Sequence, residues 1–577
     1  MITFVGCTTG IIQESNPYQV EIKGVADEDL NEKILSYSLM QKQQDSPPES
    51  SFVLTQRAKK DIPTFIKLLR SKAYYNAKIT IKLDQKETPP RLIFKVNLGP
   101  QYALQSVVIH QNTDSLKKPT LKQINLTPDQ PALTSTILAA EQKLLTYAKR
   151  QSYAFATLCP RKVVVNHDLK TVSVELCLKT GEQVFVGAVG FTGNQNIKAD
   201  FLKKLIQWQQ GTAYNQKTID SQRLKLIDSR LFILARLKLA TKADEDGYFP
   251  VTFELKERLP RTVSAGLRLT TDDELFLARF AWEHRNLWGQ GEVIDAALKV
   301  SMIKSSLAAS FRKPVFYHPN NTLIMDSEFI SEDTDAFKSL RAEFAVAIEH
   351  QLTKKQRFNI GLAYQFSRVT EYNQISENFN LISLPIHFNG DFSDNFLEPT
   401  TGGRLSIDEQ PFYNLGTGAR FHKQKIRYRH YLSLTKSDNL IVAGRIIIGN
   451  IWGENLVNIP ADLRYFAGGS DTVRGYSFQS LSPKDEQGRL IGGLSLFAFS
   501  IELRQWITEN IGIVGFLDGG RAYADAYQNF ADLKMGAGLG LRYKTPIGAI
   551  RFDLARPLNK RDEDDEFQLY MSIGHTF

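Results

Sequence analysis

Residues 259–577 alternate apolar and polar side chains with a period of two, and this pattern is the strongest constraint on the fold. Between Leu533 and Tyr543 the odd positions are apolar or aromatic, and the even positions are lysine, arginine or glycine. The alternation returns near Val263 and from Phe567 to Phe577, where only His575 departs from it. Since neighbouring side chains of a β-strand point to opposite faces, each such stretch is predicted to be a strand with one apolar face. Recurrence across more than half of the chain favours a transmembrane antiparallel β-barrel with a polar lumen over a soluble β-sandwich.

The length of this segment predicts about 16 strands. At about 10 residues per tilted membrane strand, eight strands would leave very long loops and 22 strands would leave almost none. No stretch approaches the ~18 uninterrupted apolar residues of a helical span, and Arg445 interrupts the most apolar one, 440–449. Hydrophobic residues make up only 42% of the chain, which suits a barrel because its membrane-facing residues are every second one.

Residues 17–258 show three segments with a strand–helix–helix–strand–strand order, which predicts three small α+β modules at 17–98, 99–179 and 180–258. The third is the clearest, with a strand at 184–191, helices at 199–209 and 221–234, and strands at 235–239 and 249–256. Residues 1–16 are predicted to be a tail. A secretory signal has a basic start and an apolar core, and neither stands before the first module, so we expect a truncated or mis-started N-terminus.

The sequence Val473-Arg474-Gly475-Tyr476 places an arginine in a loop between two predicted strands. A charge inside a membrane protein needs a partner or a water-filled cavity. The alternation on the next two strands turns Glu502 and Asp518 toward the lumen. A loop folded back into the barrel would bring Arg474 between these carboxylates, which its planar guanidinium can bind through two parallel hydrogen bonds. On spacing alone, an ordinary loop charge and an ordinary lumen acid are the simpler interpretation.

Four motifs make the chain resemble the outer-membrane barrel-assembly superfamily, and within it the TamA family, the barrel subunits of translocation and assembly modules. They are the loop motif Val473–Tyr476 with the preceding 462–469, the strand motif from Phe516 through Asp518 to Gly520, the hairpin 540–553, and a turn pattern over 394–405. The three N-terminal segments resemble polypeptide-transport-associated (POTRA) modules, and three is the number in the TamA family. In the superfamily the loop motif contacts the lumen, so the resemblance favours the pairing of Arg474 with Glu502 and Asp518.

The resemblance implies an assembly factor of the bacterial outer membrane, with the barrel in the membrane and the POTRA modules in the periplasm. Such a factor inserts or translocates autotransporter-type and other β-barrel proteins. Its implied partners are unfolded outer-membrane proteins, membrane lipids and an inner-membrane-anchored TamB-like protein that docks on the modules. The terminal residues Ile573, Gly574 and Phe577 resemble the signal by which barrels are recognised for their own insertion. Two alternatives stay open: a two-partner secretion transporter that exports soluble proteins, and lipid transport with the same partner.

The ends of the predicted barrel bear on its mechanism. A first and a last strand that pair poorly offer an edge to which an incoming strand can be added. These strands are expected near 262–270 and 567–577. We expect the seam between them to open or to thin the adjacent bilayer, and a fully closed barrel is the alternative.

Two of the three cysteines, Cys159 and Cys177, are symmetric about Asp168 in a predicted hairpin. In an unbulged antiparallel pair they would be directly opposed, and in an oxidising compartment they could form a disulfide. After a bulge they would instead be two buried thiols on different faces. The spacing leaves both outcomes open.

No motif in the chain predicts an enzyme, a metal site or a cofactor site. The Gly-x-Gly in Asn286–Gly291 lacks a third glycine and a following helix, so it is interpreted as a turn between early strands. The net charge of +9 is spread along the chain and predicts no nucleic-acid partner. The basic row Lys423, Lys425, Arg427 and Arg429 is interpreted as one lumen-facing side of a strand.

Overall fold

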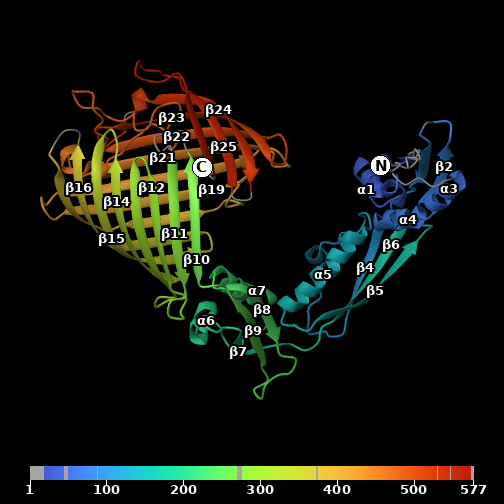
Figure 1. The fold of residues 1–577 in the computed structure, drawn as a ribbon. Helices are drawn as coiled ribbons and strands as arrows, with labels where there is room; N and C mark the ends of the chain where they lie inside the picture. Colours follow the sequence, from blue (N-terminus) through green and yellow to red (C-terminus); the bar gives the residue numbers. More distant parts are fainter. Residues whose placement is uncertain are drawn as a thin grey trace, which may run out of the picture. The chain divides into compact units, whose positions relative to one another are not determined.

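The computed structural model describes residues 18–44, 50–87, 89–269, 276–371, 375–528, 530–545 and 548–573. Three small α/β modules are followed by one large antiparallel sheet (Figure 1). The predicted tail at residues 1–16 lies outside the described residues. Among the residues that are described, no helix combines the length and the apolar character needed to cross a membrane.

Each module holds a three-stranded sheet whose last strand in the sequence is the central one. In the first two modules this central strand pairs in parallel with the first strand and antiparallel with the second. The first module consists of β1 (Gln19–Lys23), α1 (Glu28–Ser36), α2 (Leu39–Lys42), α3 (Ser51–Lys59), α4 (Asp61–Ser71), β2 (Lys78–Asp84) and β3 (Arg91–Asn97). It contains four helices where the sequence pattern predicted two. The buried Asp61 explains the break between α1 and α2. Its carboxylate accepts hydrogen bonds from the Ser38 hydroxyl and from the backbone N–H groups of Leu39 and Met40, the first residues of α2.

The second and third modules have shorter helical layers. The second consists of β4 (Ala103–Gln111), the 3-10 turn η1 (Leu121–Ile124), α5 (Thr134–Arg150), β5 (Thr157–Asn166) and β6 (Thr171–Lys179). The third consists of β7 (Val186–Thr192), α6 (Ala199–Ile206), α7 (Gln216–Asp228), β8 (Phe232–Leu239) and β9 (Phe249–Glu257). The predicted helix at 221–234 is wrong at both ends. Helix α7 stops at Asp228 because Arg230 adopts a φ of 61°, and the buried Phe232 then begins β8.

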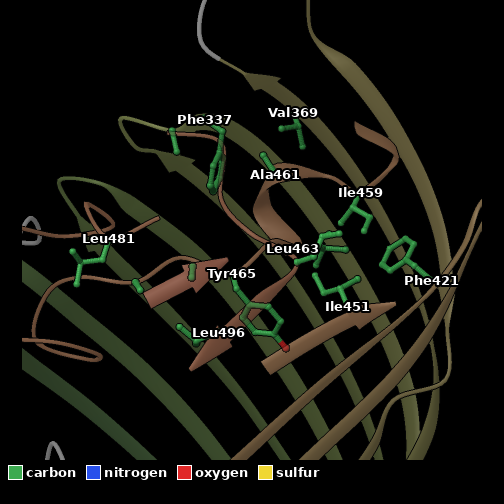
Figure 2. Close-up of a cluster of buried hydrophobic side chains, with 14 of the residues drawn as sticks. Phe337, Val369, Phe421, Ile451, Ile459, Ala461, Leu463, Tyr465, Leu481 and Leu496 are labelled. Carbon is green, nitrogen blue, oxygen red and sulfur yellow. The ribbon is translucent and has the colours of Figure 1, made fainter. Parts of the chain in front are cut away.

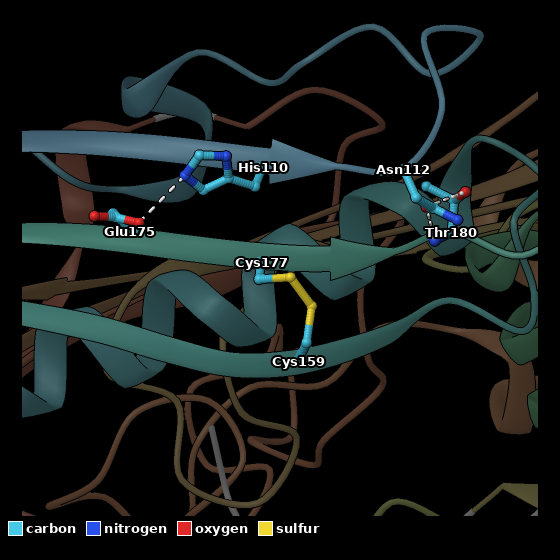
Figure 3. Close-up of a disulfide and its surroundings, with 6 residues drawn as sticks. All are labelled: His110, Asn112, Cys159, Glu175, Cys177 and Thr180. Atoms are coloured by element: carbon cyan, nitrogen blue, oxygen red, sulfur yellow. Dashed lines mark hydrogen bonds and ion pairs between the residues drawn. A yellow bond between two sulfur atoms is a disulfide. The ribbon is translucent and has the colours of Figure 1, made fainter.

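The β5–β6 hairpin carries a disulfide between Cys159 and Cys177, which are directly opposed with Cα atoms 5.2 Å apart (Figure 3). The hairpin is not centred on Asp168, because Asn166 pairs with Thr171. A register shift between Cys159 and Lys162 compensates for this offset. Of the two outcomes that the spacing left open, the structure therefore has the opposed and bonded cysteines, and it has them together with a bulge.

The large sheet runs in sequence order from β10 to β26. Its strands are β10 (Arg261–Leu269), β11 (Phe276–Arg285), β12 (Val293–Ser301), β13 (Lys304–Pro314), β14 (Asn321–Asp333), β15 (Phe337–Thr353), β16 (Gln356–Glu371), β17 (Glu377–Ser383), β18 (Ile386–Asp391), β19 (Gly402–Asn414), β20 (Arg420–Ser433), β21 (Leu440–Trp452), β22 (Ser495–Trp506), β23 (Ile511–Tyr523), β24 (Lys534–Thr545), β25 (Gly548–Pro557) and β26 (Gln568–Ile573).

The seventeen strands occupy sixteen positions. Strands β17 and β18 both pair with β16 on one side and β19 on the other, so they are two halves of one strand. The interruption falls at Leu384 and Pro385, where proline has no backbone N–H to donate. The prediction of a barrel of about 16 strands is therefore confirmed.

The predicted alternation sets the two faces of the sheet. On β24, Leu539 is 74% and Leu541 is 57% exposed on the outer face, whereas the next residue, the inward-facing Arg542, is 5% exposed. This outer face is apolar where a lipid surface would contact it, and the inner face carries the charges.

Candidate functional site

The loop between β21 and β22, residues 453–494, folds back inside the barrel (Figure 2). It contains the 3-10 turns η2 (Leu456–Asn458) and η3 (Ala461–Leu463). Its apolar side chains form a buried cluster with side chains from the inner wall, among them Ile459, Leu463, Tyr465, Val473, Tyr476 and Leu481 from the loop and Phe337, Phe421, Ile451 and Leu496 from the wall. Burial of this apolar surface fixes the loop in the lumen.

Two ion pairs anchor the first part of this loop. Arg464 donates to both carboxylate oxygens of Glu371, at 2.6 and 2.9 Å. Asp462 accepts hydrogen bonds from serines of β15 and β16 and lies 3.6 Å from Arg341. From the predicted basic row on β20, the Lys423 ammonium donates to the Leu463 carbonyl at 2.7 Å. The sequence reasoning missed these anchors, because nothing local shows which part of the wall a loop will reach.

Arg474 lies at the centre of a buried charge cluster and is itself 4% exposed. Its Nε and Nη2 donate to the two oxygens of Asp518 at 2.7 and 2.9 Å, which is the bidentate geometry. Its Nη1 lies 2.8 Å from Glu502 and 3.0 Å from Asp553. Its Nη2 also donates to the Ser500 hydroxyl at 3.1 Å. The structure thus places Arg474 against both carboxylates that the sequence singled out, and it adds Asp553 as a third.

An aromatic ring and two glycines make room for Arg474 against the barrel wall. The Arg474 guanidinium carbon lies 3.5 Å from the ring centre of Phe516, a residue of the predicted strand motif. Gly475 has a φ of 98°, and a Cβ there would lie 2.8 Å from the Arg556 carbonyl. A Cβ on Gly536 would overlap the Arg474 carbonyl oxygen. Glycine is therefore required on both sides of the contact.

The same loop motif contacts the last strands of the barrel. The Gly475 amide donates to the Tyr570 hydroxyl of β26 at 3.0 Å, and the Tyr476 hydroxyl donates to the Met535 carbonyl of β24 at 3.1 Å. Val473 and Tyr476 are fully buried. The motif thus ties β22 to β26 into one block.

The contribution of Asp553 could have been predicted from the sequence. Residues Arg551-Phe552-Asp553 belong to the hairpin motif, and alternation places Arg551 and Asp553 on the same face of β25. Gly520, the other end of the strand motif, is inward-facing and packs closely on β22, because a Cβ there would lie 2.5 Å from the Phe497 carbonyl oxygen. Of the predicted terminal signal, Gly574 and Phe577 lie outside the described residues, and Ile573 ends β26.

Strands β10 and β26 are neighbours at the ends of the sheet. Within Arg261–Leu269 and Gln568–Ile573, the parts of these strands that the structure describes, no β-ladder joins them. All other neighbouring strands of the sheet are joined by ladders. The outer edge of β10 is therefore without a sheet partner over its described residues.

Two turns at the same end of the barrel are ordered by side chains. In the predicted turn at Asn286–Gly291, the side-chain amide of Asn286 donates to the backbone carbonyl of Asn196. The backbone N–H of Lys198 also donates to the backbone carbonyl of Gly289. In the turn 392–401, burial disfavours ionisation of Asp394, but hydrogen bonds from Thr400 and its neighbour outweigh this effect and lower the pKa of Asp394 to about 2. The first turn is therefore hydrogen-bonded to the segment 196–198.

No group of three or more metal-ligating side chains suited to a metal ion occurs in the described ranges. The site consists of buried ion pairs and hydrogen bonds between the loop and the barrel wall.

The chain is similar to known outer-membrane proteins. The model of the Omp85 superfamily domain matches residues 286–577. The outer membrane protein assembly factor BamA of Nitratidesulfovibrio vulgaris is 24% identical over 520 residues, which are 86% of this chain and 65% of that protein. BamA of Neisseria meningitidis serogroup B is 20% identical over 590 residues, covering 90% of this chain and 73% of that protein. The chain thus spans about two thirds of the length of these relatives.

A solved structure has the same fold. BamA from Haemophilus ducreyi lacking POTRA domains 1–3 superposes with a TM-score of 0.68 at 16% identity, covering 82% of this chain and 99% of that one. At this identity the likeness concerns the fold alone.

Proposed function

Because this chain belongs to the Omp85 superfamily, we propose that it is an assembly factor that inserts or translocates β-barrel proteins. The chain is an outer-membrane β-barrel protein with periplasmic POTRA modules. Unfolded outer-membrane proteins are its proposed substrates. The observation that carries the proposal is that, over their described residues, β10 and β26 are not joined by a β-ladder.

The physical reason lies in the bilayer. A strand entering the hydrocarbon core must have its N–H and C=O groups hydrogen-bonded, since lipid offers no partners. The edge of β10 that has no ladder over the described residues of β26 can supply such partners along Arg261–Leu269. An incoming strand can therefore pair with β10 before it leaves the barrel wall.

The loop motif supports this mechanism. Arg474, Gly475 and Tyr476 bind strands from β22 to β26, and among the described residues none of their hydrogen bonds reaches β10. We infer that the seam opens by separation of β10 from a β22–β26 block that the loop keeps intact. Arg474 is then a structural latch and not a substrate ligand.

The finer assignment is to the TamA type. On this proposal the substrates include autotransporter-type proteins, and a TamB-like periplasm-spanning protein docks on the POTRA modules. The loop, strand and hairpin motifs support it. Two-partner secretion of soluble proteins and lipid transport with the same partner are the competing assignments.

A cross-link tests the seam. One cysteine between Arg261 and Gly266 of β10 and one between Gln568 and Ser572 of β26 should form a disulfide and abolish assembly of a barrel substrate in liposomes, and a reductant should restore it. The control is a cross-link between Ala281 and Ala297, which are directly opposed in the β11–β12 ladder, and it should leave assembly intact. Full assembly with the seam cross-linked would refute opening.

Depletion of the protein followed by outer-membrane proteomics and lipid analysis tests the substrate class. We expect loss of integral barrel proteins, autotransporters among them. Loss of exported soluble proteins alone would favour two-partner secretion, and altered lipid composition with an unchanged set of barrels would favour lipid transport.

A further inference from the structure

A cavity of about 210 Å³ lies inside the barrel next to the Arg474 cluster. Its walls come from β21 to β25 and from the turns that precede β19 and β21. Four cations and two carboxylates line it: Arg504, Arg542, Lys544, Arg551, Glu398 and Asp438. The lining is therefore strongly positive.

Three of these cations already have carboxylate partners. Arg504 lies 2.8 Å from Glu502, and Lys544 lies 2.9 Å from Glu398. Arg542 donates to both oxygens of Asp553.

Arg551 is different. It is 4% exposed, and its buried Nε and Nη1 have no hydrogen-bond partner among the described residues. An unpartnered buried charge is costly, so this guanidinium needs a counter-charge.

The nearby carboxylates Glu502 and Asp553 attract Arg551 through space, but among the described residues neither forms an ion pair with it, and both are shared with other arginines. Glu502 is bound to Arg474 and Arg504, and Asp553 is bound to Arg474 and Arg542. Asp438 is exposed at the rim, and no ion pair joins it to Arg551. The cavity thus has a surplus of positive charge that is concentrated on one buried side chain.

We propose that this cavity is a binding site for a phosphate-type oxyanion, with Arg551 as its principal ligand and Arg504, Arg542 and Lys544 around it. Cations from three strands surround a tetrahedral anion better than a planar carboxylate, and arginine binds phosphate oxygens through two parallel N–H groups. The apolar side chains of Ile441, Ile513 and Val514 line another part of the wall and leave room for the carbon substituent of a phosphate ester. The phosphate has two possible sources, a soluble phosphate ester or a phospholipid headgroup. The proposal does not depend on the assembly function.

The test uses the full chain in phosphate-free detergent and in phosphatidylglycerol nanodiscs. Inorganic phosphate and glycerol 3-phosphate are titrated by calorimetry, and retained phosphatidylglycerol is counted by native mass spectrometry. The variants are Arg551→Gln and, in case this one does not fold, Lys544→Gln at the edge of the cavity. The control is Arg427→Gln, which removes an arginine of the basic row on β20 that does not line the cavity. Heat-modifiable migration on gels verifies that each barrel is folded.

We expect saturable binding that Arg551→Gln weakens about tenfold or more and Lys544→Gln weakens about threefold, with Arg427→Gln unchanged. Binding of the soluble probes identifies a soluble ester as the source. Retention of one phosphatidylglycerol per chain without binding of the soluble probes identifies a headgroup. Absence of saturable binding by every probe, or equal binding by the wild type and the cavity variants, overturns the proposal.

Discussion

Removal of the Arg474 side chain tests the latch most directly. Arg474→Ala deletes the cation that Asp518, Glu502 and Asp553 share. The three carboxylates are not equally affected. Glu502 keeps Arg504 at 2.8 Å, and Asp553 keeps Arg542.

Asp518 is the carboxylate that loses most. It is fully buried, and after the substitution it keeps the Ser500 hydroxyl at 2.5 Å, the backbone N–H of residue 474 at 3.0 Å and the attraction of the buried Arg445 guanidinium on β21. Breaking a buried pair by removal of one partner typically costs about 3–5 kcal/mol, because a charge is left without compensation. We expect Arg474→Ala to lower the free energy of unfolding by about this amount. Asp518→Asn in the Arg474→Ala background should then recover about 1–3 kcal/mol, the usual size of a coupling between contacting residues.

The assay is urea unfolding in phospholipid vesicles, followed by tryptophan fluorescence, for each single variant and each pair. Arg464→Ala is the matched control, since Arg464 is a buried arginine of the same loop with a bidentate partner. Its partner Glu371 is 30% exposed and can be hydrated, so this substitution should cost less than Arg474→Ala.

Three results would refute this reasoning. Arg474→Ala could cost no more than Arg464→Ala. Its coupling to Asp518→Asn could fall below about 0.5 kcal/mol, the lower limit for residues in contact. Its coupling to Glu502→Gln could exceed its coupling to Asp518→Asn, which would mean that Asp518 is not the main partner.

Three further predictions concern other parts of the chain. Reduction of the Cys159–Cys177 disulfide should lower the free energy of unfolding of the second module by about 3 kcal/mol, as measured by urea titration with and without reductant, and an unchanged midpoint would contradict this. Because the folded-state pKa of Asp394, about 2, lies below its unfolded value of about 4, its stabilisation of the turn 392–401 is complete above pH 4 and is lost as the pH falls through 2. An NMR titration of the turn amides should show this transition, and the Asp394→Asn variant should lack it. Gly536→Ala should displace the docked loop and increase its protease sensitivity, whereas Gly444→Ala, where a Cβ meets no atom within 4 Å, should have no effect.

The alternation of side chains predicted which residues face the lumen, because successive residues of a strand point to opposite faces whatever the rest of the fold. Glu502, Asp518 and the basic row on β20 all lie on the inner face for this reason. The third partner, Asp553, shows the same alternation. Alternation does not tell, however, how far a loop enters the barrel or which strands it contacts. That depth is set by an apolar cluster assembled from residues far apart in the sequence.

Boundaries and registers were the weaker predictions. The hairpin of the second module has a longer turn and a bulge, and the two departures cancel at Cys159 and Cys177. A symmetric spacing cannot reveal such a compensation. In the first module, the helical layer has four helices instead of the two that the pattern predicted, because the buried Asp61 binds the backbone at the start of α2, far from it in the sequence.

The glycines of β24 show how the wall and the loop depend on each other. In the sequence, Gly536, Gly538 and Gly540 only mark the face opposite the apolar one. In the structure, a Cβ would overlap the Arg474 carbonyl at the first, the Phe516 ring at the second and the Asp553 carboxylate at the third. Each of these three groups belongs to the Arg474 cluster. The strand therefore has no side chains at the positions that these groups occupy. The docking site of the loop is therefore a property of β24 as much as of the loop motif. A loop carrying the motif can dock in another barrel only if the facing strand has glycine at the corresponding inward positions.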